Sequence, residues 1–211
     1  MYLNIFMLEY DIFISHSWGY DLKKRENHER CRKLCNKLKV DGFNVWFDEY
    51  NLYGNIDSSI MNAIRSSRII LICLTKKYYD KIYNGINNGI INDNCYKEWN
   101  YSIILNKNII PIIMEPKMRD IYISTDNLLQ IYLNNILFIN MSNSISYEYL
   151  KLKKYIFNFN TINTINTINT INTMNTINTI NKYKNVKENT INANIKKYRY
   201  NRLNIKEVLR L

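Results

Sequence analysis

Short runs of apolar residues alternate with longer amphipathic or polar segments from residue 10 to about residue 159. This alternation is typical of a parallel β-sheet whose strands are connected by covering helices. The predicted strands are residues 10–15, 43–47, 69–74, 109–113 and 136–139. Pro111 cannot donate a hydrogen bond to a neighbouring strand, so we expect the fourth strand at or near an edge of the sheet.

A helix is predicted between the first two strands. Cys31, Leu34, Cys35 and Leu38 are spaced at i, i+3, i+4 and i+7, which places them on one helix face and in the core. A cysteine pair at i, i+4 could also bind a metal ion. No second pair with ligand spacing exists and His28 lies off the stripe, so we expect no metal site.

The connections after the second and third strands differ in composition. Residues 48–55 form a polar loop in which Gly54 is suited to a positive φ. A helix marked by Ile56, Ile60 and Ile64 then follows. Residues 78–94 are rich in Asn and Gly, and we expect a long loop there, either a functional lid or a disordered segment.

The overall composition is that of a globular protein. Hydrophobic residues make up 46% and charged residues 22% of the chain, which excludes a fully disordered or collagen-like protein. No apolar run approaches the roughly 20 residues of a membrane span, and the first ten residues do not resemble a signal peptide. We therefore expect a cytoplasmic protein whose four cysteines are free thiols.

The pattern changes near residue 160, which divides the chain into a domain (1–159), a repeat (160–181) and a basic tail (182–211). Residues 160–180 are seven Asn-Thr-Ile triplets with one Met, and a period of three gathers the isoleucines on no single face. We predict a disordered C-terminal tail. Its last part has nine Lys+Arg against two Asp+Glu, so weak contact with RNA or an anionic membrane is an open alternative to simple solvation.

Several enzyme classes are excluded by absent motifs. The five glycines form neither a Gly-x-Gly-x-x-Gly turn nor a Gly-Lys-Ser/Thr phosphate loop. The two histidines, His16 and His28, have no nucleophile-elbow partner. In a doubly wound sheet ligands bind beyond the carboxyl ends of the strands, which points to residues 16–19, residues 48–55, the segment from Thr75 onward and residues 95–99.

Five segments together resemble the Toll/interleukin receptor (TIR) domain family over about residues 8–159. They are Tyr-Asp-Ile-Phe-Ile-Ser-His-Ser-Trp (10–18), Gly-Phe-Asn-Val-Trp-Phe-Asp (42–48), Ile-Arg-Ser-Ser-Arg-Ile-Ile-Leu-Ile (64–72), Cys-Tyr-Lys-Glu-Trp (95–99) and Asn-Ile-Ile-Pro-Ile-Ile (108–113). The resemblance implies a flavodoxin-like three-layer α/β sandwich, with a five-stranded parallel sheet in the order 2-1-3-4-5 and helices on both faces.

The resemblance implies two alternative functions. Some TIR domains cleave NAD+ into nicotinamide and ADP-ribose, linear or cyclic, with a glutamate that falls on Glu98 here. NAD+ is then the substrate, and no separate cofactor is implied. Ser17, Trp18 and Tyr53 occupy positions that contact the ligand, although the family's arginines and acidic residue are replaced there.

Other TIR domains are non-catalytic modules that bind further TIR domains, or copies of themselves, through the loop after the second strand. Asp48, Leu52 and Gly54 are the interaction residues that this alternative implies. Without the resemblance, Glu98 would be expected as a solvated helix residue. Trp99 and Ile103 are i, i+4 neighbours and are expected to pack inward.

One carboxylate is enough for the NAD+ reaction. Nicotinamide in NAD+ is already a cationic leaving group, so no general acid has to protonate it. The ribose centre becomes oxocarbenium-like as the bond breaks, and a nearby negative charge stabilises it. The glutamate can also hold the ribose hydroxyls in position.

Overall fold

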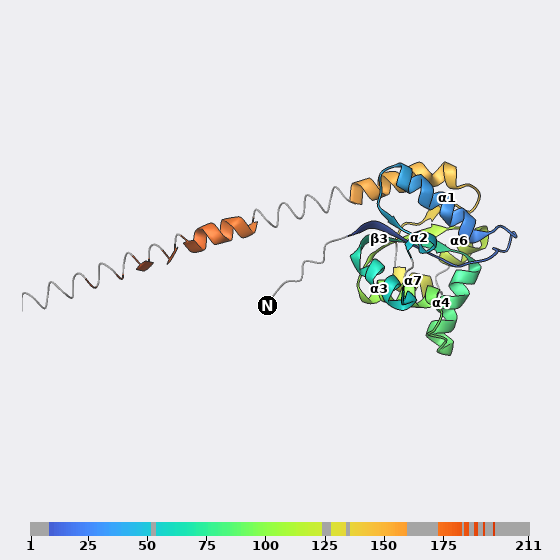
Figure 1. The fold of residues 1–211 in the computed structure, drawn as a ribbon, viewed down its shortest axis with the longest axis horizontal. Helices are drawn as coiled ribbons and strands as arrows, with labels where there is room; N and C mark the ends of the chain where they lie inside the picture. The colour runs from blue at the N-terminus through green and yellow to red at the C-terminus, as the bar shows by residue number, and fades with distance from the viewer. Residues whose placement is uncertain are drawn as a thin grey trace, which may run out of the picture. The chain divides into compact units, whose positions relative to one another are not determined.

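The computed structural model describes residues 9–51, 54–123, 128–133, 136–159 and 173–182, together with residues 184, 185, 188, 189, 192 and 196. Five parallel strands form one sheet in the order β2-β1-β3-β4-β5 (Figure 1). The strands are β1 (Tyr10–His16), β2 (Val45–Trp46), β3 (Ser67–Leu74), β4 (Asn108–Ile113) and β5 (Ile139–Asn140). The flavodoxin-like sheet predicted from the sequence is confirmed.

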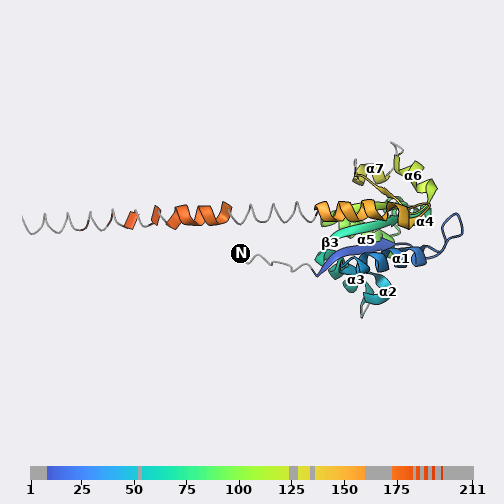
Figure 2. The same ribbon diagram turned by 90° about the horizontal axis from the view of Figure 1, so that it is seen from above.

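Helices cover both faces of this sheet. They are α1 (Asn27–Val40), α2 (Asp48–Asn51), α3 (Ile56–Ser66), α4 (Lys76–Asn88), α5 (Asn94–Ile104), α6 (Pro116–Ile123) and α7 (Leu128–Leu133), and a further helix covers residues 145–159. Figure 1 shows α1 on one face and α3 and α4 on the other. Figure 2 shows α2 and α3 near one edge of the sheet and α6 and α7 near the other edge.

The core has the composition that the strand and helix patterns predict. The central strand β3 is buried from Ile69 to Leu74, as expected for a parallel strand covered on both faces. Cys31 and Cys35 are fully buried on α1, and all four cysteines are free thiols. Trp99 is buried and Ile103 packs against the same core, so the predicted inward orientation of both is confirmed.

Strand β4 is second from the edge of the sheet, which agrees with the position expected for Pro111. The pairing of β4 with the edge strand β5 begins at Ile112, one residue after the proline. The lost backbone donor of Pro111 therefore leaves the β4–β5 register intact. Strand β5 starts at Ile139, later than the predicted residue 136.

The prediction of a long loop over residues 78–94 is wrong, because α4 occupies most of this segment. Thr75 caps this helix by accepting a hydrogen bond from the backbone N–H of Tyr78, and Gly89 ends it with φ +69°. Tyr78 and Ile82 are fully buried one turn apart. The apolar stripe thus outweighs the low helix propensity of the Asn and Gly residues.

The connection between β1 and α1 is fixed by a buried aspartate. Asp21 accepts hydrogen bonds from the backbone of Lys23 and Arg25 and from the guanidinium groups of Arg25 and Arg30. The two arginines also donate to backbone carbonyls of Met114, Met141 and Ser142. This network holds the end of the sheet near β5 against the start of α1.

Contacts within the chain separate Met1–Lys153 from Lys154–Leu211. In the second unit, part of the Asn-Thr-Ile repeat is helical over residues 173–182, and its Met174, Ile177 and Ile180 side chains are exposed, so this helix buries no core. Residues 160–172 and most of the basic tail lie outside the described residues. No helix in the described part of the chain is long and apolar enough to span a membrane.

Candidate functional site

Glu98 lies on α5 and faces the sheet. Asp93 caps this helix by accepting a hydrogen bond from the Cys95 backbone, and the buried positions Cys95, Glu98 and Ser102 recur at the helical period. Only 9% of Glu98 is exposed. The expectation of a solvated glutamate, drawn without the family resemblance, is therefore wrong.

The hydroxyl group of Ser15 connects Glu98 to the end of β1, and the hydroxyl group of Tyr78 contacts Ser15. Ser15 Oγ donates a hydrogen bond to Glu98 Oε2 at 2.5 Å. The same Ser15 oxygen lies 2.6 Å from the hydroxyl of Tyr78, which is fully buried on α4. Elements β1, α4 and α5 thus each contribute one polar side chain to a buried cluster at the carboxyl edge of the sheet.

Burial sets the charge state of Glu98. It raises the pKa of this carboxyl to about 8, and the negative charges of Asp48 and Asp93 act in the same direction. The Ser15 hydrogen bond and the positive charge of Lys81 lower the pKa and partly offset these effects. In this conformation Glu98 is therefore mostly protonated at neutral pH.

Trp18 and Ser17 follow Ser15 and His16 in the chain but face different ways. Trp18 is 57% exposed, and its Nε1 donates a hydrogen bond to Asp48 Oδ2 at 2.8 Å. Ser17 is buried, and its hydroxyl lies 2.8 Å from that of Thr75. Of these two predicted ligand contacts, Trp18 presents an open face to solvent and Ser17 is directed inward.

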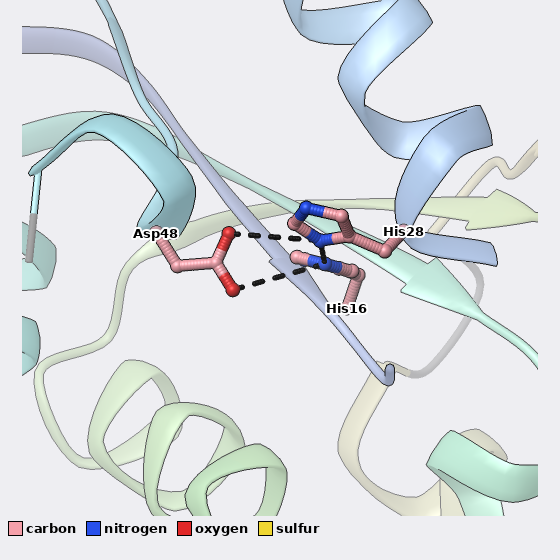
Figure 3. A group of neighbouring side chains, drawn as sticks. All are labelled: His16, His28 and Asp48. Carbon is pink, nitrogen blue, oxygen red and sulfur yellow. Dashed lines mark hydrogen bonds and ion pairs between the residues drawn. The ribbon is translucent and has the colours of Figure 1, made fainter. Parts of the chain in front are cut away.

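A second polar cluster at this edge consists of His16, His28 and Asp48, whose side chains point toward one another (Figure 3). His16 Nε2 lies 2.7 Å from His28 Nδ1, and Asp48 oxygens lie 3.8 Å and 3.9 Å from these two nitrogens. Burial lowers the pKa of His16 to about 4, so this imidazole is neutral.

The sequence prediction missed this cluster because it placed His28 off the apolar stripe of α1. His28 precedes Cys31 by three residues and Cys35 by seven, so it belongs to the buried face. The fold brings His28 next to His16, the last residue of β1, and no pattern in the sequence predicts this contact.

The loop after β2 is partly helical. Asp48–Asn51 form α2, and Gly54 has the positive φ of +66° that the sequence predicts. Leu52 and Tyr53 lie outside the described residues. Beside this loop is a pocket of about 310 Å³ that is lined by Glu9, Tyr10, Trp46, Asn51, Asn55, Ser58, Ser59, Asn62 and Ala63.

Comparison with known proteins gives a consistent family. The family model described as "TIR domain" matches residues 12–154. A protein named NAD(+) hydrolase TcpA, from Theionarchaea archaeon (strain DG-70-1), is 33% identical over 75 residues. That match spans 35% of this chain and only 21% of the relative.

A solved structure is also similar to this chain. It is the TIR domain of the Toll-related receptor TRR-2 from Hydra magnipapillata, with 18% identity and a TM-score of 0.46. The similarity covers 70% of this chain and 98% of the receptor domain.

Proposed function

Because this chain belongs to the TIR-domain family, we propose that it cleaves NAD+ to nicotinamide and ADP-ribose, with Glu98 as the catalytic carboxylate. The observation that carries the proposal is the burial of Glu98 against Ser15 at the carboxyl edge of the sheet. Ligands of doubly wound sheets bind at this edge. The relative named as an NAD(+) hydrolase supports the same activity.

The chemistry requires Glu98 in its charged form. A carboxylate beside the scissile bond stabilises the oxocarbenium-like ribose, whereas a protonated carboxyl does not. Bound NAD+ brings a positively charged nicotinamide ring next to Glu98, and an opposite charge within a few ångströms lowers the pKa of a carboxyl. Substrate binding therefore helps to create the charged group that cleaves the substrate.

Access to Glu98 requires a rearrangement, since its carboxyl is hydrogen-bonded and almost fully buried. We place the moving part in the loop after β2, which begins at Asp48, and expect TIR–TIR contact between copies of the chain to fix its open form. Trp18, with its exposed ring, is positioned to stack on an aromatic part of the dinucleotide.

A second candidate function is a non-catalytic module that binds other TIR domains through the same loop. It is favoured by three exposed apolar side chains on α2 and α3, Tyr50, Ile56 and Met61. Such side chains are enriched at protein interfaces. In this alternative Glu98 has a structural role only.

The deciding experiment is chromatography of nicotinamide released from NAD+ by the full chain over a concentration series, with and without a crowding agent. Glu98→Gln keeps the shape and removes the ability to ionise, and Glu29→Gln changes a partly exposed glutamate on α1 as the control. Release that rises faster than linearly with concentration, and is lost in Glu98→Gln alone, is expected. No release by self-associated wild-type protein would leave the interaction module as the function.

A further inference from the structure

The only two histidines of the chain meet at the carboxyl end of β1, although twelve residues separate them. Asp48, the first residue of α2, completes the group, and all three ligand atoms lie within 4.8 Å of one another (Figure 3). We propose that His16, His28 and Asp48 bind a divalent transition-metal ion of the Zn²⁺ class. This inference does not depend on NAD+ cleavage.

The distances are close to those of a metal site. A tetrahedral ion about 2.1 Å from each nitrogen would hold the two nitrogens about 3.4 Å apart. In the structure His16 Nε2 and His28 Nδ1 are 2.7 Å apart, and Asp48 oxygens lie 3.8 Å and 3.9 Å from them. The two nitrogens must therefore separate by about 0.7 Å. The 3.8 Å and 3.9 Å distances involve different oxygens of Asp48, so one of these oxygens must also move closer to the nitrogen pair, since the three ligand atoms now lie up to 4.8 Å apart.

The hydrogen bonds around the cluster leave its inner atoms available. Glu49 Oε2 lies 3.2 Å from His28 Nε2, and since a carboxylate only accepts, Nε2 carries the proton and Nδ1 the lone pair. In the metal-free chain His16 Nε2 donates to that lone pair. Metal binding requires that His16 carries its proton on Nδ1 instead and that the two nitrogens move apart.

Glu49 also gives the site an outer shell. A histidine ligand whose second nitrogen donates to a carboxylate is the usual arrangement in protein zinc sites. The indole N–H of Trp18 donates a hydrogen bond to Asp48 Oδ2, and the backbone N–H of Glu49 donates one to Asp48 Oδ1. Each of these oxygens keeps a free lone pair. The ligands are therefore oriented before any metal binds.

The surroundings favour an ion with one open position. The ring of Trp18 stacks on His28 at 3.8 Å, and that of Phe47 stacks on both histidines at 5.1 Å. The histidines are buried, whereas 14% of the Asp48 side chain is exposed, which leaves an approach for the ion and a water. Two imidazoles and a carboxylate suit Zn²⁺, Cu²⁺ and Co²⁺ better than Mg²⁺ or Ca²⁺.

A bound ion would connect β1, α1 and α2. Asp48 begins the loop that the family resemblance implies in TIR–TIR contact, so metal binding would hold the start of that loop against the sheet. We therefore expect the ion to make the loop more resistant to proteolysis.

The test uses the untagged full chain. Zn²⁺ affinity is measured by competition with a chromophoric chelator, and Co²⁺ binding by its visible d–d absorption. We expect a single site, with affinity lowered at least about 100-fold in His28→Gln and in Asp48→Asn and about 10-fold in Glu49→Gln. Asp80→Asn, at an exposed ion pair on α4, is the matched control and should bind as wild type does.

Two results would overturn the proposal. One is the absence of competition with a chelator of micromolar affinity by wild-type protein. The other is Zn²⁺ binding that survives both ligand variants, or that is lost in Cys95→Ser, since the ion would then use a thiolate. Circular dichroism of every variant separates loss of the site from loss of the fold.

Discussion

Ser15 Oγ donates a 2.5 Å hydrogen bond to the carboxyl of Glu98, across 83 positions of sequence. The contact joins the end of β1 to the second turn of α5, and the hydroxyl of Tyr78 on α4 is hydrogen-bonded to the same Ser15 oxygen. A hydrogen bond of this kind favours the charged form of a carboxyl. Ser15 thus opposes the burial that raises the pKa of Glu98 to about 8.

The pH dependence of NAD+ cleavage should follow the ionisation of Glu98. The carboxylate fraction grows as pH rises, so kcat/KM of the free protein should increase with pH and level off above a limb near pH 8. The cationic substrate lowers the pKa in the complex, so the limb of kcat should lie at lower pH. Nicotinamide release between pH 5.5 and 9.5 measures both, and a flat kcat/KM profile would contradict the assignment.

Protein stability should also depend on the ionisation of Glu98, but it should decrease as pH rises, whereas NAD+ cleavage should increase. The folded chain holds a proton on Glu98 up to about pH 8, while the unfolded chain releases it near pH 4.5. The folded state therefore binds more protons between these values, and stability falls as pH rises through this window, by at most about 5 kcal/mol.

Glu98→Gln cannot ionise and should lack that component. Urea unfolding of both proteins at pH 5, 7 and 9 checks this, with Glu29→Gln as the control. The difference in unfolding free energy between Glu98→Gln and wild type should increase in favour of the variant toward pH 9. An equal pH dependence in the two proteins would show that Glu98 is ionised when folded.

Ser15→Ala removes the hydrogen bond that stabilises the Glu98 carboxylate. We expect the rising limb of kcat/KM to move upward by about one pH unit, because a hydrogen bond to a charged group contributes about 1.5 kcal/mol or more. Ser15→Thr retains the hydroxyl and should keep the wild-type limb. A lower rate without a shifted limb would mean that Ser15 acts only through packing.

The alternation of strands and helices could be predicted from the chain itself, and the strand order 2-1-3-4-5 from the family resemblance; both are confirmed. Apolar runs such as residues 69–74 mark buried strands. The family resemblance pointed to Glu98, whose catalytic role stays a prediction. The contact of Glu98 with Ser15 could not be predicted, since it depends on the register of β1 and β3, which pairs Ser15 with Ile72. A shift of one residue would turn the serine to the other face.

Helix α4 and the His16–His28 pair were missed for different reasons. In α4 the Asn and Gly residues have low helix propensity, and burial of Tyr78 and Ile82 together with the Thr75 cap stabilises the helix. The histidines lie on separate elements, so no spacing in the sequence predicts their meeting. Local sequence patterns therefore indicated most helices and strands. The contacts of Ser15 with Glu98 and of His16 with His28 depend on long-range packing, which such patterns do not reveal.

Asp21→Asn should destabilise the chain by about 2–4 kcal/mol, because it leaves the half-buried Arg25 and Arg30 without their counter-ion. Burial alone would raise the pKa of Asp21, but the hydrogen bonds from Arg25 bring this pKa below its usual value. The contribution of Asp21 is therefore present at neutral pH and lost in acid.

Urea unfolding at pH 7 measures the cost of Asp21→Asn. The exposed pair of Lys76 and Asp80 on α4 provides a control, and Asp80→Asn should change the unfolding free energy by less than about 1 kcal/mol. Equal effects of the two substitutions would mean that the Asp21 network contributes no more than a surface ion pair.

Gly85→Ala should destabilise the protein although alanine is the better helix former. A Cβ at residue 85 would lie 2.1 Å from the ring of Tyr96, so α4 and α5 could not keep their present distance. An exposed helical glycine gains up to about 1 kcal/mol on replacement by alanine, whereas overpacking of this kind costs about 1–3 kcal/mol. Thermal unfolding gives the sign directly.

A double-mutant cycle identifies the ring of Tyr96 as the cause. Tyr96→Ala removes the ring atoms Cγ, Cδ2 and Cε2 that the new methyl group would meet, so Gly85→Ala should be much better tolerated in that background, with a coupling of about 1 kcal/mol or more. Asn87→Ala, on the exposed face of α4, is the control and should be close to neutral. A Gly85→Ala protein as stable as wild type would show that α4 can move away from α5 at little cost.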